Sequence, residues 1–292
     1  MYKLELSLNE RETFCTLREE NFMIPVKHFI YRLRLKLNKF ISSRVYFRNL
    51  SIWDDWQDWS EIDVKFQQLS EDKNFVRFRR NQLLLETMEY KNFDAKKYSD
   101  DLVSLGIREP RVGKPILPFG LKNSLNLGHQ YRHVTYFNEF SKNNLANIDR
   151  IFEFGAGYGC MRWLLSELNH KGSYFIIDNP GVSELQKRYL RSSVKSDSFM
   201  KTNWAASIQN LEINLQENDL FIALWSLSEV STKLMEQVLG ILENSQCRLL
   251  IAFQNTYNGR DNFRHFSQYF KNAARIPISY PEGNLHSTYI IR

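Results

Sequence analysis

One segment near the middle of the chain, residues 151–180, restricts the fold more than any other. It begins with the apolar residues Ile151, Phe152 and Phe154, which form a run of strand type, and three glycines follow at GxGxG spacing. Helix-forming residues come next, and a second apolar run ends at Asp178. We therefore predict a strand, a tight turn, a helix and a second strand. A βαβ unit of this kind holds nucleoside-type ligands at the carboxyl ends of its strands.

The glycine spacing and two acidic residues narrow the choice of ligand. Glu153 lies two residues before Gly155, and Gly159 comes one residue earlier than the third glycine of the GxGxxG turn in dinucleotide-binding domains. A carboxylate at 153 suits a cationic ligand and would repel a pyrophosphate. Asp178 is placed to accept hydrogen bonds from ribose hydroxyls. The pattern E-x-G-x-G-x-G, followed by a strand that ends in Asp, resembles the S-adenosylmethionine site of class I methyltransferases. A nicotinamide or flavin site and a turn without a ligand are the alternatives.

Composition and charge set the wider class of the protein. The hydrophobic share of 43% and the charged share of 25% are ordinary for a globular protein, and 292 residues suffice for a core with an accessory region. The three cysteines are far apart and show neither disulfide nor zinc spacing, which favours a reducing cytosol. No run of 18 apolar residues and no signal-like start occur, so we expect neither membrane spanning nor secretion by a signal peptide.

The net charge of +6 is concentrated in residues 27–48, which carry many Lys and Arg residues and no Asp or Glu. Apolar residues recur there at helical spacing, which predicts a basic amphipathic helix. Such a helix packs on the main domain, or it docks on an anionic membrane surface, glycan or nucleotide carrier. We find no nucleic-acid-binding motif beside it and expect no nucleic-acid partner. Trp53, Trp56 and Trp59 follow at helical spacing and either pack against this helix or contact a sugar.

The rest of the chain predicts an α/β domain behind a helical region. Three prolines and two glycines in residues 108–120 indicate a loop, so we divide the chain into a mostly helical N-terminal region, 1–120, and a core, 121–292. The resemblance to methyltransferases implies that a helix between 121 and 144 covers the ligand site, with His129, Tyr131, Arg132 and His133 near it; surface-exposed histidines are the alternative. Further strands are predicted at 197–202, 219–225 and 247–254. The last residues, ARIPISYPEGNLHSTYIIR, read as a β-hairpin, which a dinucleotide-binding domain normally lacks.

Four segments together carry a closer resemblance. FEFGAGYGCMRWLL, YFIIDNPGVSELQKRYL, LWSLSEV and the terminal HSTYIIR are similar to those of a family of bacterial sugar O-methyltransferases, over roughly residues 75–292. The resemblance implies a Rossmann-like seven-stranded class I methyltransferase core with a mostly helical N-terminal extension. It also implies S-adenosyl-L-methionine as the cofactor and transfer of its methyl group to a hydroxyl of a glycoside, a surface polysaccharide or a nucleotide-sugar precursor.

The cofactor-binding residues that we predict lie in the glycine turn and after the strands that follow it. They are Glu153, Gly155, Ala156, Gly157, Gly159, Asp178, Asn179, Asn203, Trp204, Trp225 and Ser226. Trp204 is placed where an aromatic ring could stack on adenine. The polar loop after the strand 247–254 suits hydrogen bonding to sugar hydroxyls, and its predicted substrate-binding residues are Asn255, Tyr257, Asn258 and Arg260.

Methyl transfer to a hydroxyl needs a general base, because a protonated hydroxyl is a poor nucleophile. Glu229, a few residues after the strand 219–225, is our first candidate, although an acidic residue there also suits the start of the next helix. His286 and His265 are the next candidates, because neutral histidine is the usual base near neutral pH. The exit of the strand 219–225 carries one carboxylate and not a cluster, so we expect no metal.

Two alternatives to a cytoplasmic sugar O-methyltransferase stay open. One is methylation of another small molecule or of a lipid-linked glycan, with residues 27–48 at the inner face of the membrane. The other is a non-catalytic protein that keeps the fold.

Overall fold

The computed structural model describes residues 95–292, except 113–114, 116, 118–120, 207–214 and 279–286. Three sequence predictions therefore lie outside the described residues. They are the basic helix of residues 27–48, the tryptophans at 53–59 and the role of His286 as a base.

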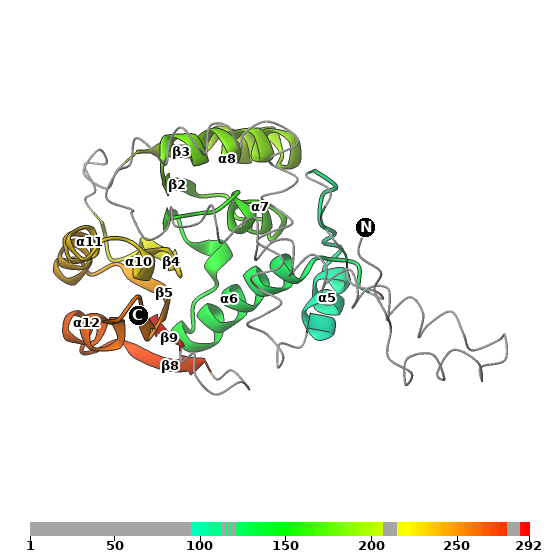
Figure 1. Cartoon of the computed structure of the whole chain (residues 1–292). Helices are drawn as coiled ribbons and strands as arrows, with labels where there is room; N and C mark the ends of the chain where they lie inside the picture. The colour runs from blue at the N-terminus through cyan, green and yellow to red at the C-terminus, as the bar shows by residue number, and fades with distance from the viewer. Residues whose placement is uncertain (1–94, 113–114, 116, 118–120, 207–214, 279–286) are drawn as a thin grey trace, which may run out of the picture.

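A mixed sheet of seven strands runs through the described residues, in the order β3-β2-β1-β4-β5-β9-β8 (Figure 1). The strands are β1 (Arg150–Phe154), β2 (Ser173–Ile177), β3 (Thr202–Ala205), β4 (Leu220–Leu224), β5 (Arg248–Gln254), β8 (Ala274–Ile278) and β9 (Ser287–Ile291). The first five pair in parallel, while β9 lies between β5 and β8 and is antiparallel to both. This arrangement confirms the predicted Rossmann-like seven-stranded sheet, whereas the predicted helical character of residues 1–94 lies outside the described residues. The predicted terminal hairpin is the antiparallel edge of the sheet.

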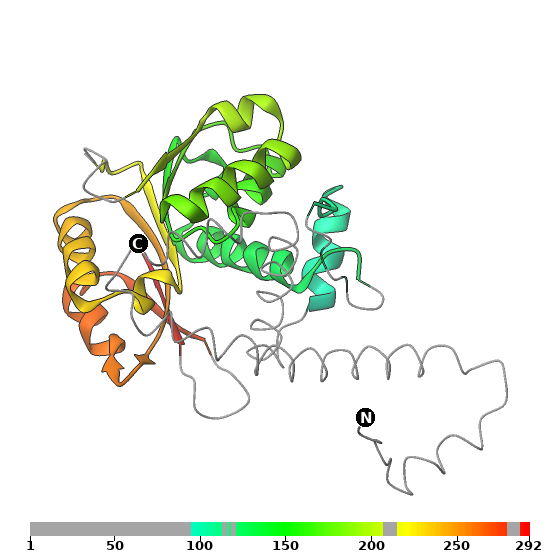
Figure 2. The same cartoon turned by 45° about the horizontal axis from the view of Figure 1, so that its top comes forward.

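Alternating side chains of the strands face two separate hydrophobic clusters. In β1, Ile151 belongs to the cluster under α6 (Leu125–Ser141), α7 (Cys160–Glu167) and α8 (Pro180–Ser193). Phe152 belongs to the cluster under α11 (Thr232–Asn244) and α12 (Asn262–Tyr269). The two sets of helices cover opposite faces of the sheet (Figure 2). Burying both faces explains the continuous apolar runs of β4 and β5.

Residues 95–112 pack on the core through hydrogen bonds to the start of α6. Helix α5 (Ala95–Ser104) contacts α6, and Leu102 is fully buried in the core. The Glu109 carboxylate accepts from the Ser124 backbone N–H at 2.8 Å, and the Glu109 N–H donates to the Asn123 side chain at 2.8 Å. The Ser124 hydroxyl in turn caps α6 by accepting from the Leu127 N–H. The division of the chain at residue 120 stays a prediction.

Residues 196–205 differ from the sequence interpretation. The predicted strand 197–202 is mostly the short helix α9 (Ser196–Met200), and β3 begins at Thr202. Asp197 in the first turn favours the helix by its charge. The pairing of β2 sets the start of β3, because Tyr174 pairs with Thr202 and Ile177 with Ala205. Asn203 and Trp204 consequently lie inside the strand and not in the loop after it.

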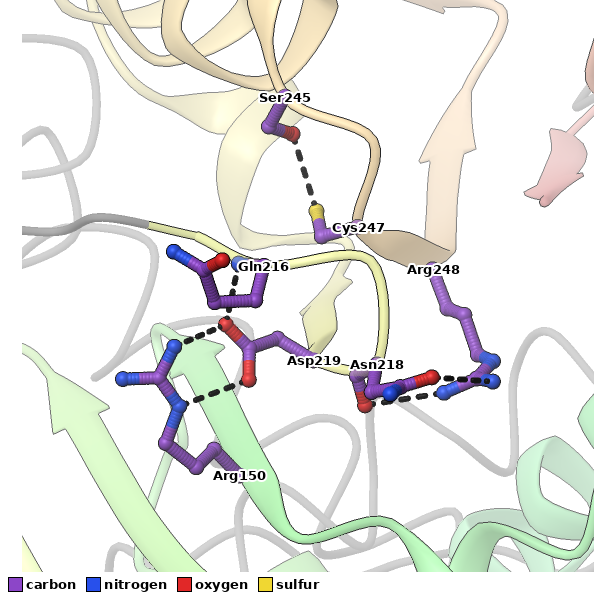
Figure 3. Close-up of polar contacts among 7 residues, drawn as sticks. All are labelled: Arg150, Gln216, Asn218, Asp219, Ser245, Cys247 and Arg248. Atoms are coloured by element: carbon purple, nitrogen blue, oxygen red, sulfur yellow. Dashed lines mark hydrogen bonds and ion pairs between the residues drawn. The ribbon is translucent and has the colours of Figure 1, made fainter.

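The edge of the sheet at the amino ends of its parallel strands is held by polar contacts (Figure 3). The Arg150 guanidinium of β1 donates two hydrogen bonds to the Asp219 carboxylate, of 2.8 and 2.6 Å, just before β4. The Gln216 backbone N–H donates to the same carboxylate at 2.6 Å. Arg248 at the start of β5 donates to the backbone and side-chain oxygens of Asn218. These contacts fix the starts of three neighbouring strands.

Candidate active site

The glycine turn joins β1 to α7 at the carboxyl edge of the sheet. Gly155 has a φ of 73° and its N–H donates to the carbonyl oxygen of Ile177 in β2 at 3.0 Å. A Cβ on Gly155 would lie 2.3 Å from the Cβ of Ser226, which follows β4. The Ser226 hydroxyl donates to the carbonyl oxygen of Phe154. Gly155 is therefore required both by its backbone conformation and by the close approach of the β4 exit.

Asp178 and its neighbours form the acidic end of the site. The Asp178 carboxylate accepts from the Asn179 N–H at 2.8 Å and from the Gln186 side-chain amide at 2.7 Å. The same amide also donates to the carbonyl oxygen of Gly157 at 2.9 Å, so Gln186 links β2 to the glycine turn. Burial raises the pKa of Asp178 to about 7, although these hydrogen bonds oppose the rise. Asn179 caps α8, and its buried Nδ2 has no hydrogen-bond partner among the described residues.

Glu153 is buried beneath the turn and not open to it. Only 3% of Glu153 is exposed, and its carboxylate accepts from the Tyr174 hydroxyl at 2.8 Å. Burial raises the pKa of Glu153 to about 8, and the nearby Asp178 adds to the rise. The Arg162 guanidinium lies 5.2 Å from the Tyr174 ring centre and donates to Thr202. The structure thus places Glu153 in the packing between β1 and β2, and its predicted role in cofactor binding stays a prediction.

The aromatic residue predicted to stack on adenine packs elsewhere. Trp204 pairs with Ile176 in the sheet, and its ring lies 5.7 Å from that of Phe199 in α9. The ammonium group of Lys187 in α8 is 5.8 Å from the indole. Trp204 therefore covers the face of the sheet under α8 and α9, while Asn203 is exposed. The prediction that Trp204 stacks on adenine assumed that it follows the strand. Because β3 begins only at Thr202, Trp204 lies inside the strand, and that assumption is wrong.

Trp225 leaves β4 in a strained conformation beside α6. Its φ is 70°, which is rare for a bulky residue, and its N–H donates to the carbonyl oxygen of Ala252 in β5 at 2.7 Å. The Trp225 ring lies 6.3 Å from the His129 ring and 6.5 Å from the His133 ring. Such strain in a non-glycine residue is concentrated at functional sites. The predicted covering helix thus reaches the exit of β4.

Both α6 histidines are buried and neutral. Burial lowers the pKa of His129 to about 3, and the nearby charge of Arg132 lowers it further. Burial also lowers the pKa of His133 well below its ordinary value. The Nδ1 of His133 lies 2.6 Å from the hydroxyl of Tyr289 in β9. These side chains add hydrogen-bonding groups to the site without adding charge.

Glu229 is the last residue of the short helix α10 (Ser226–Glu229), and it does not start the next helix. Ser231 is the N-cap of α11, which begins at Thr232. The Glu229 carboxylate is partly exposed and accepts from the side-chain amide of Gln254, at the end of β5, at 3.0 Å. The structure therefore places Glu229 at the carboxyl ends of β4 and β5, where the sequence predicted a base.

The segment after β5, which the sequence analysis treated as a polar loop, contains regular secondary structure. It forms a small hairpin of β6 (Thr256–Tyr257) and β7 (Arg260–Asp261) around Asn258 and Gly259, which both have positive φ. Asn-Gly between two strands is a strong hairpin signal that the sequence analysis missed. The Arg260 guanidinium donates to the carbonyl oxygens of Ser228 and Val230, so it caps α10.

The remaining predicted residues are placed as follows. The Asn255 side chain accepts from the Thr288 hydroxyl at 2.8 Å, which joins β5 to β9 at this edge. His265 lies in α12, and its Nε2 is 3.3 Å from a Glu236 carboxylate oxygen of α11. The structure thus directs His265 toward α11 and does not bring it to Glu229 or Trp225.

Sequence reasoning missed Gln186, Tyr174 and Tyr289 as parts of this edge. Gln186 and Asp178 are joined only through the fold, and apolar strands conceal the two tyrosines as ordinary core residues. Among the described residues, no three His, Cys, Asp or Glu side chains gather as metal ligands would. None of the helices in the described ranges combines the length and the apolar composition needed to cross a bilayer.

Comparison with known proteins gives likeness of fold. No family model and no curated protein sequence matches the chain. Magnesium protoporphyrin IX methyltransferase from Synechocystis PCC 6803, solved with bound S-adenosylmethionine, superposes with a TM-score of 0.43 and 12% identity over 68% of this chain and 97% of that one. Precorrin-6y C5,15-methyltransferase from Geobacter metallireducens GS-15 superposes with a TM-score of 0.39 and 10% identity, over 60% of this chain and 92% of that one. An O-methyltransferase family protein from Burkholderia thailandensis superposes with a TM-score of 0.42 and 11% identity, over 57% of each chain. We base the fold on the strand order and draw nothing about the substrate from these similarities.

Proposed function

We propose that this protein is an S-adenosylmethionine-dependent methyltransferase that methylates a sugar hydroxyl. One observation carries the cofactor: the glycine turn, the Asp178 carboxylate and the strained exit of β4 meet at one edge of the sheet. The sequence resemblance to sugar O-methyltransferases supports the choice of acceptor. The hydrogen-bonding side chains after β5, such as Asn255 and Tyr257, are compatible with it.

The residues at this edge fit the proposed cofactor. The partly exposed Asp178 carboxylate has acceptor capacity for ribose hydroxyls, and the Gln186 amide that it now binds can turn to other acceptors. The buried Asn179 Nδ2 and Gln186 Oε1, which have no partner in the described structure, add a donor and an acceptor beside it. The turn at Gly157, with a φ of 57°, brings backbone close to the ligand without a Cβ.

Bound S-adenosylmethionine would supply a methyl group activated by its sulfonium. The chain has two tasks: to align the acceptor oxygen with that methyl carbon and to remove the hydroxyl proton. The acceptor oxygen would take the methyl group that the cofactor gives up, and the hydroxyl proton would pass to the base. We assign the proton to the Glu229 carboxylate, which the Gln254 amide orients at 3.0 Å. Arg260 holds the backbone that carries it.

Isothermal titration of the purified protein with S-adenosylmethionine tests the cofactor. We expect micromolar binding that Gly157→Arg and Asp178→Ala weaken heavily. Lys96→Ala, which changes the exposed pair with Asp100 on α5, serves as the folded control and should bind as the wild type does. Absence of binding by the wild-type protein would reject the proposal and favour the alternative of a non-catalytic protein that keeps the fold.

The base is tested separately by turnover. Mass spectrometry of cell extracts with and without the protein identifies the acceptor, and the reaction is then followed with that acceptor. Glu229→Gln should keep cofactor affinity and lose turnover by a factor of about 100 or more. Glu236→Gln, which changes the pair between α11 and His265 of α12, should keep both cofactor affinity and turnover. A fully active Glu229→Gln enzyme would show that a group other than Glu229 accepts the hydroxyl proton.

A further inference from the structure

One face of α6 combines charge and hydrogen-bonding groups that the proposed mechanism leaves unused. His129, Arg132, His133 and Tyr136 are spaced at i, i+3, i+4 and i+7, so they share one face of the helix. Their rings and the guanidinium touch one another: the two imidazole centres are 4.2 Å apart, and the Arg132 Cζ lies 5.0 Å from the Tyr136 ring centre. We call these four residues and Tyr289 the α6 cluster.

The α6 cluster lies at the acceptor end of the site. Tyr289 pairs with Ala252 in the sheet, and the carbonyl oxygen of Ala252 accepts from the Trp225 N–H. Trp225 in turn contacts both histidines, and the next residue, Ser226, meets the glycine turn at Gly155. A short series of contacts therefore joins the cofactor end of the edge to the α6 cluster, and it runs along β5, whose last residue, Gln254, contacts the proposed base Glu229.

Arg132 brings a positive charge to this place without a matching carboxylate. Its side chain is partly buried and donates to the Tyr136 hydroxyl at 3.3 Å. Within the described ranges, no Asp or Glu forms an ion pair with it. Its buried Nε has no hydrogen-bond partner in the described structure, and neither has the buried Nε2 of His133. Buried polar groups are seldom left unpaired, because their desolvation costs free energy that only a partner offsets.

We propose that the α6 cluster binds an anionic group of the methyl acceptor through Arg132, so that the acceptor is an acidic sugar. The group is a carboxylate, as in a uronic acid, or a phosphate, as in a sugar phosphate. This assignment of the occupant rests on the proposed function, whereas anion binding at Arg132 stands on the cluster itself. A guanidinium pairs with either group through two parallel N–H···O bonds. His133 Nε2, which has no hydrogen-bond partner in the described structure, offers a further hydrogen bond, and the Tyr136 ring centre lies 5.0 Å from the Arg132 Cζ.

Titrations with matched sugars test this assignment. Glucuronate, glucose 1-phosphate and glucose are added to the full-length protein with S-adenosylhomocysteine present, and binding is followed by calorimetry. We expect one of the two anionic sugars to bind at least tenfold more tightly than glucose, and the better one identifies the group. Arg132→Met should remove that preference, and Arg132→Lys should retain part of it. Arg191→Met, an exposed arginine whose Cζ lies 5.5 Å from the Phe199 ring centre in the α8 and α9 region, should leave it unchanged.

The outcomes separate this assignment from the proposed function. Equal binding of glucuronate, glucose 1-phosphate and glucose to the wild-type protein would overturn the anion site, and that comparison needs no variant to fold. Unchanged anion preference in a folded Arg132→Met protein, checked by circular dichroism, would overturn the role of Arg132. Anion binding that depends on Arg132 in a protein without affinity for S-adenosylmethionine would support the site and reject the methyl-transfer function.

Discussion

The Asp178 carboxylate links ligand binding to proton uptake at the scale of a single residue. Burial raises its pKa to about 7 from an ordinary value of 3.8, so the folded chain holds this proton over a range where the unfolded chain has lost it. The ligand-free fold should consequently lose stability as the pH rises from about 4 to about 7. Hydrogen bonds donated by ribose hydroxyls favour the ionised carboxylate, so binding has the opposite preference.

We predict that the affinity for S-adenosylmethionine rises as the pH rises through about 7 and levels off above it. Below that pH, each unit should weaken binding by up to about tenfold, because the bound form must release the proton. Calorimetry between about pH 5.5 and 8.5 measures the slope and the proton release. Asp178→Asn should bind weakly without this slope. Glu153→Gln should keep the slope, since Glu153 is held by Tyr174 beneath the turn; loss of the slope in that variant would assign it to Glu153.

The sequence predicted where single residues lie when their place depends only on the end of the preceding strand, while their roles stay predictions. The glycine turn, Asp178 and Glu229 lie at one edge of the sheet, as their positions after strands required. Trp204 could not be placed in this way, because one shifted strand start moves a side chain to another environment. The pairing of Tyr289 with His133 joins residues that are distant in sequence, and no local pattern reveals it.

At the scale of elements, the close approach between the turn after β1 and the exit of β4 depends on Gly155, which meets two separate requirements. Gly155 needs a positive φ, and it also leaves room for Ser226. Gly259 in the β6–β7 hairpin has a similar φ of 77°, but nothing lies within 4 Å of a Cβ built there. The two positions therefore separate backbone strain from steric contact.

We predict that Gly155→Ala destabilises the fold by more than Gly259→Ala does. Alanine at 259 should cost about 1 kcal/mol for its left-handed backbone. At 155 the contact with Ser226 should add about 1–3 kcal/mol, because the β4 exit must move. Chemical unfolding of both variants measures the difference, and cofactor titration should show weaker binding for Gly155→Ala alone. Equal losses of stability would mean that the Ser226 contact relaxes freely.

Elements were predictable from periodicity, and their ends were less so. Continuous apolar runs marked β4 and β5, and the pattern around residues 125–141 gave α6. Helix α9 and the start of β3 depend on the pairing with β2, which is a contact between distant parts of the chain. The β6–β7 hairpin carried a local signal in Asn258 and Gly259, so its absence from the sequence interpretation was an avoidable miss.

At the scale of the whole molecule, the two edges of the sheet differ in the kinds of residues and contacts that they contain. The carboxyl edge holds the glycine turn, a strained tryptophan and buried polar groups that have no partner within the part of the chain that the structure describes. The amino edge consists of satisfied polar contacts that join the starts of β1, β4 and β5 (Figure 3). The parallel strands, which the sequence predicted, place these two edges at opposite ends of the sheet. Stability and ligand binding should therefore be separable by substitution.

We predict that Asp219→Asn lowers stability and leaves cofactor affinity unchanged. The Asp219 side chain is 3% exposed and accepts hydrogen bonds from Arg150 and from the Gln216 N–H, so an amide would turn a donor toward a donor. We expect a loss of about 1–3 kcal/mol, less than for a fully buried pair, because 38% of the Arg150 side chain is exposed. Asp100→Asn, which breaks the exposed pair with Lys96 on α5, should cost less than about 0.5 kcal/mol. Urea unfolding and calorimetry with S-adenosylmethionine measure both quantities. A weaker cofactor affinity in a folded Asp219→Asn protein would show that the amino edge communicates with the site through β1 and β4.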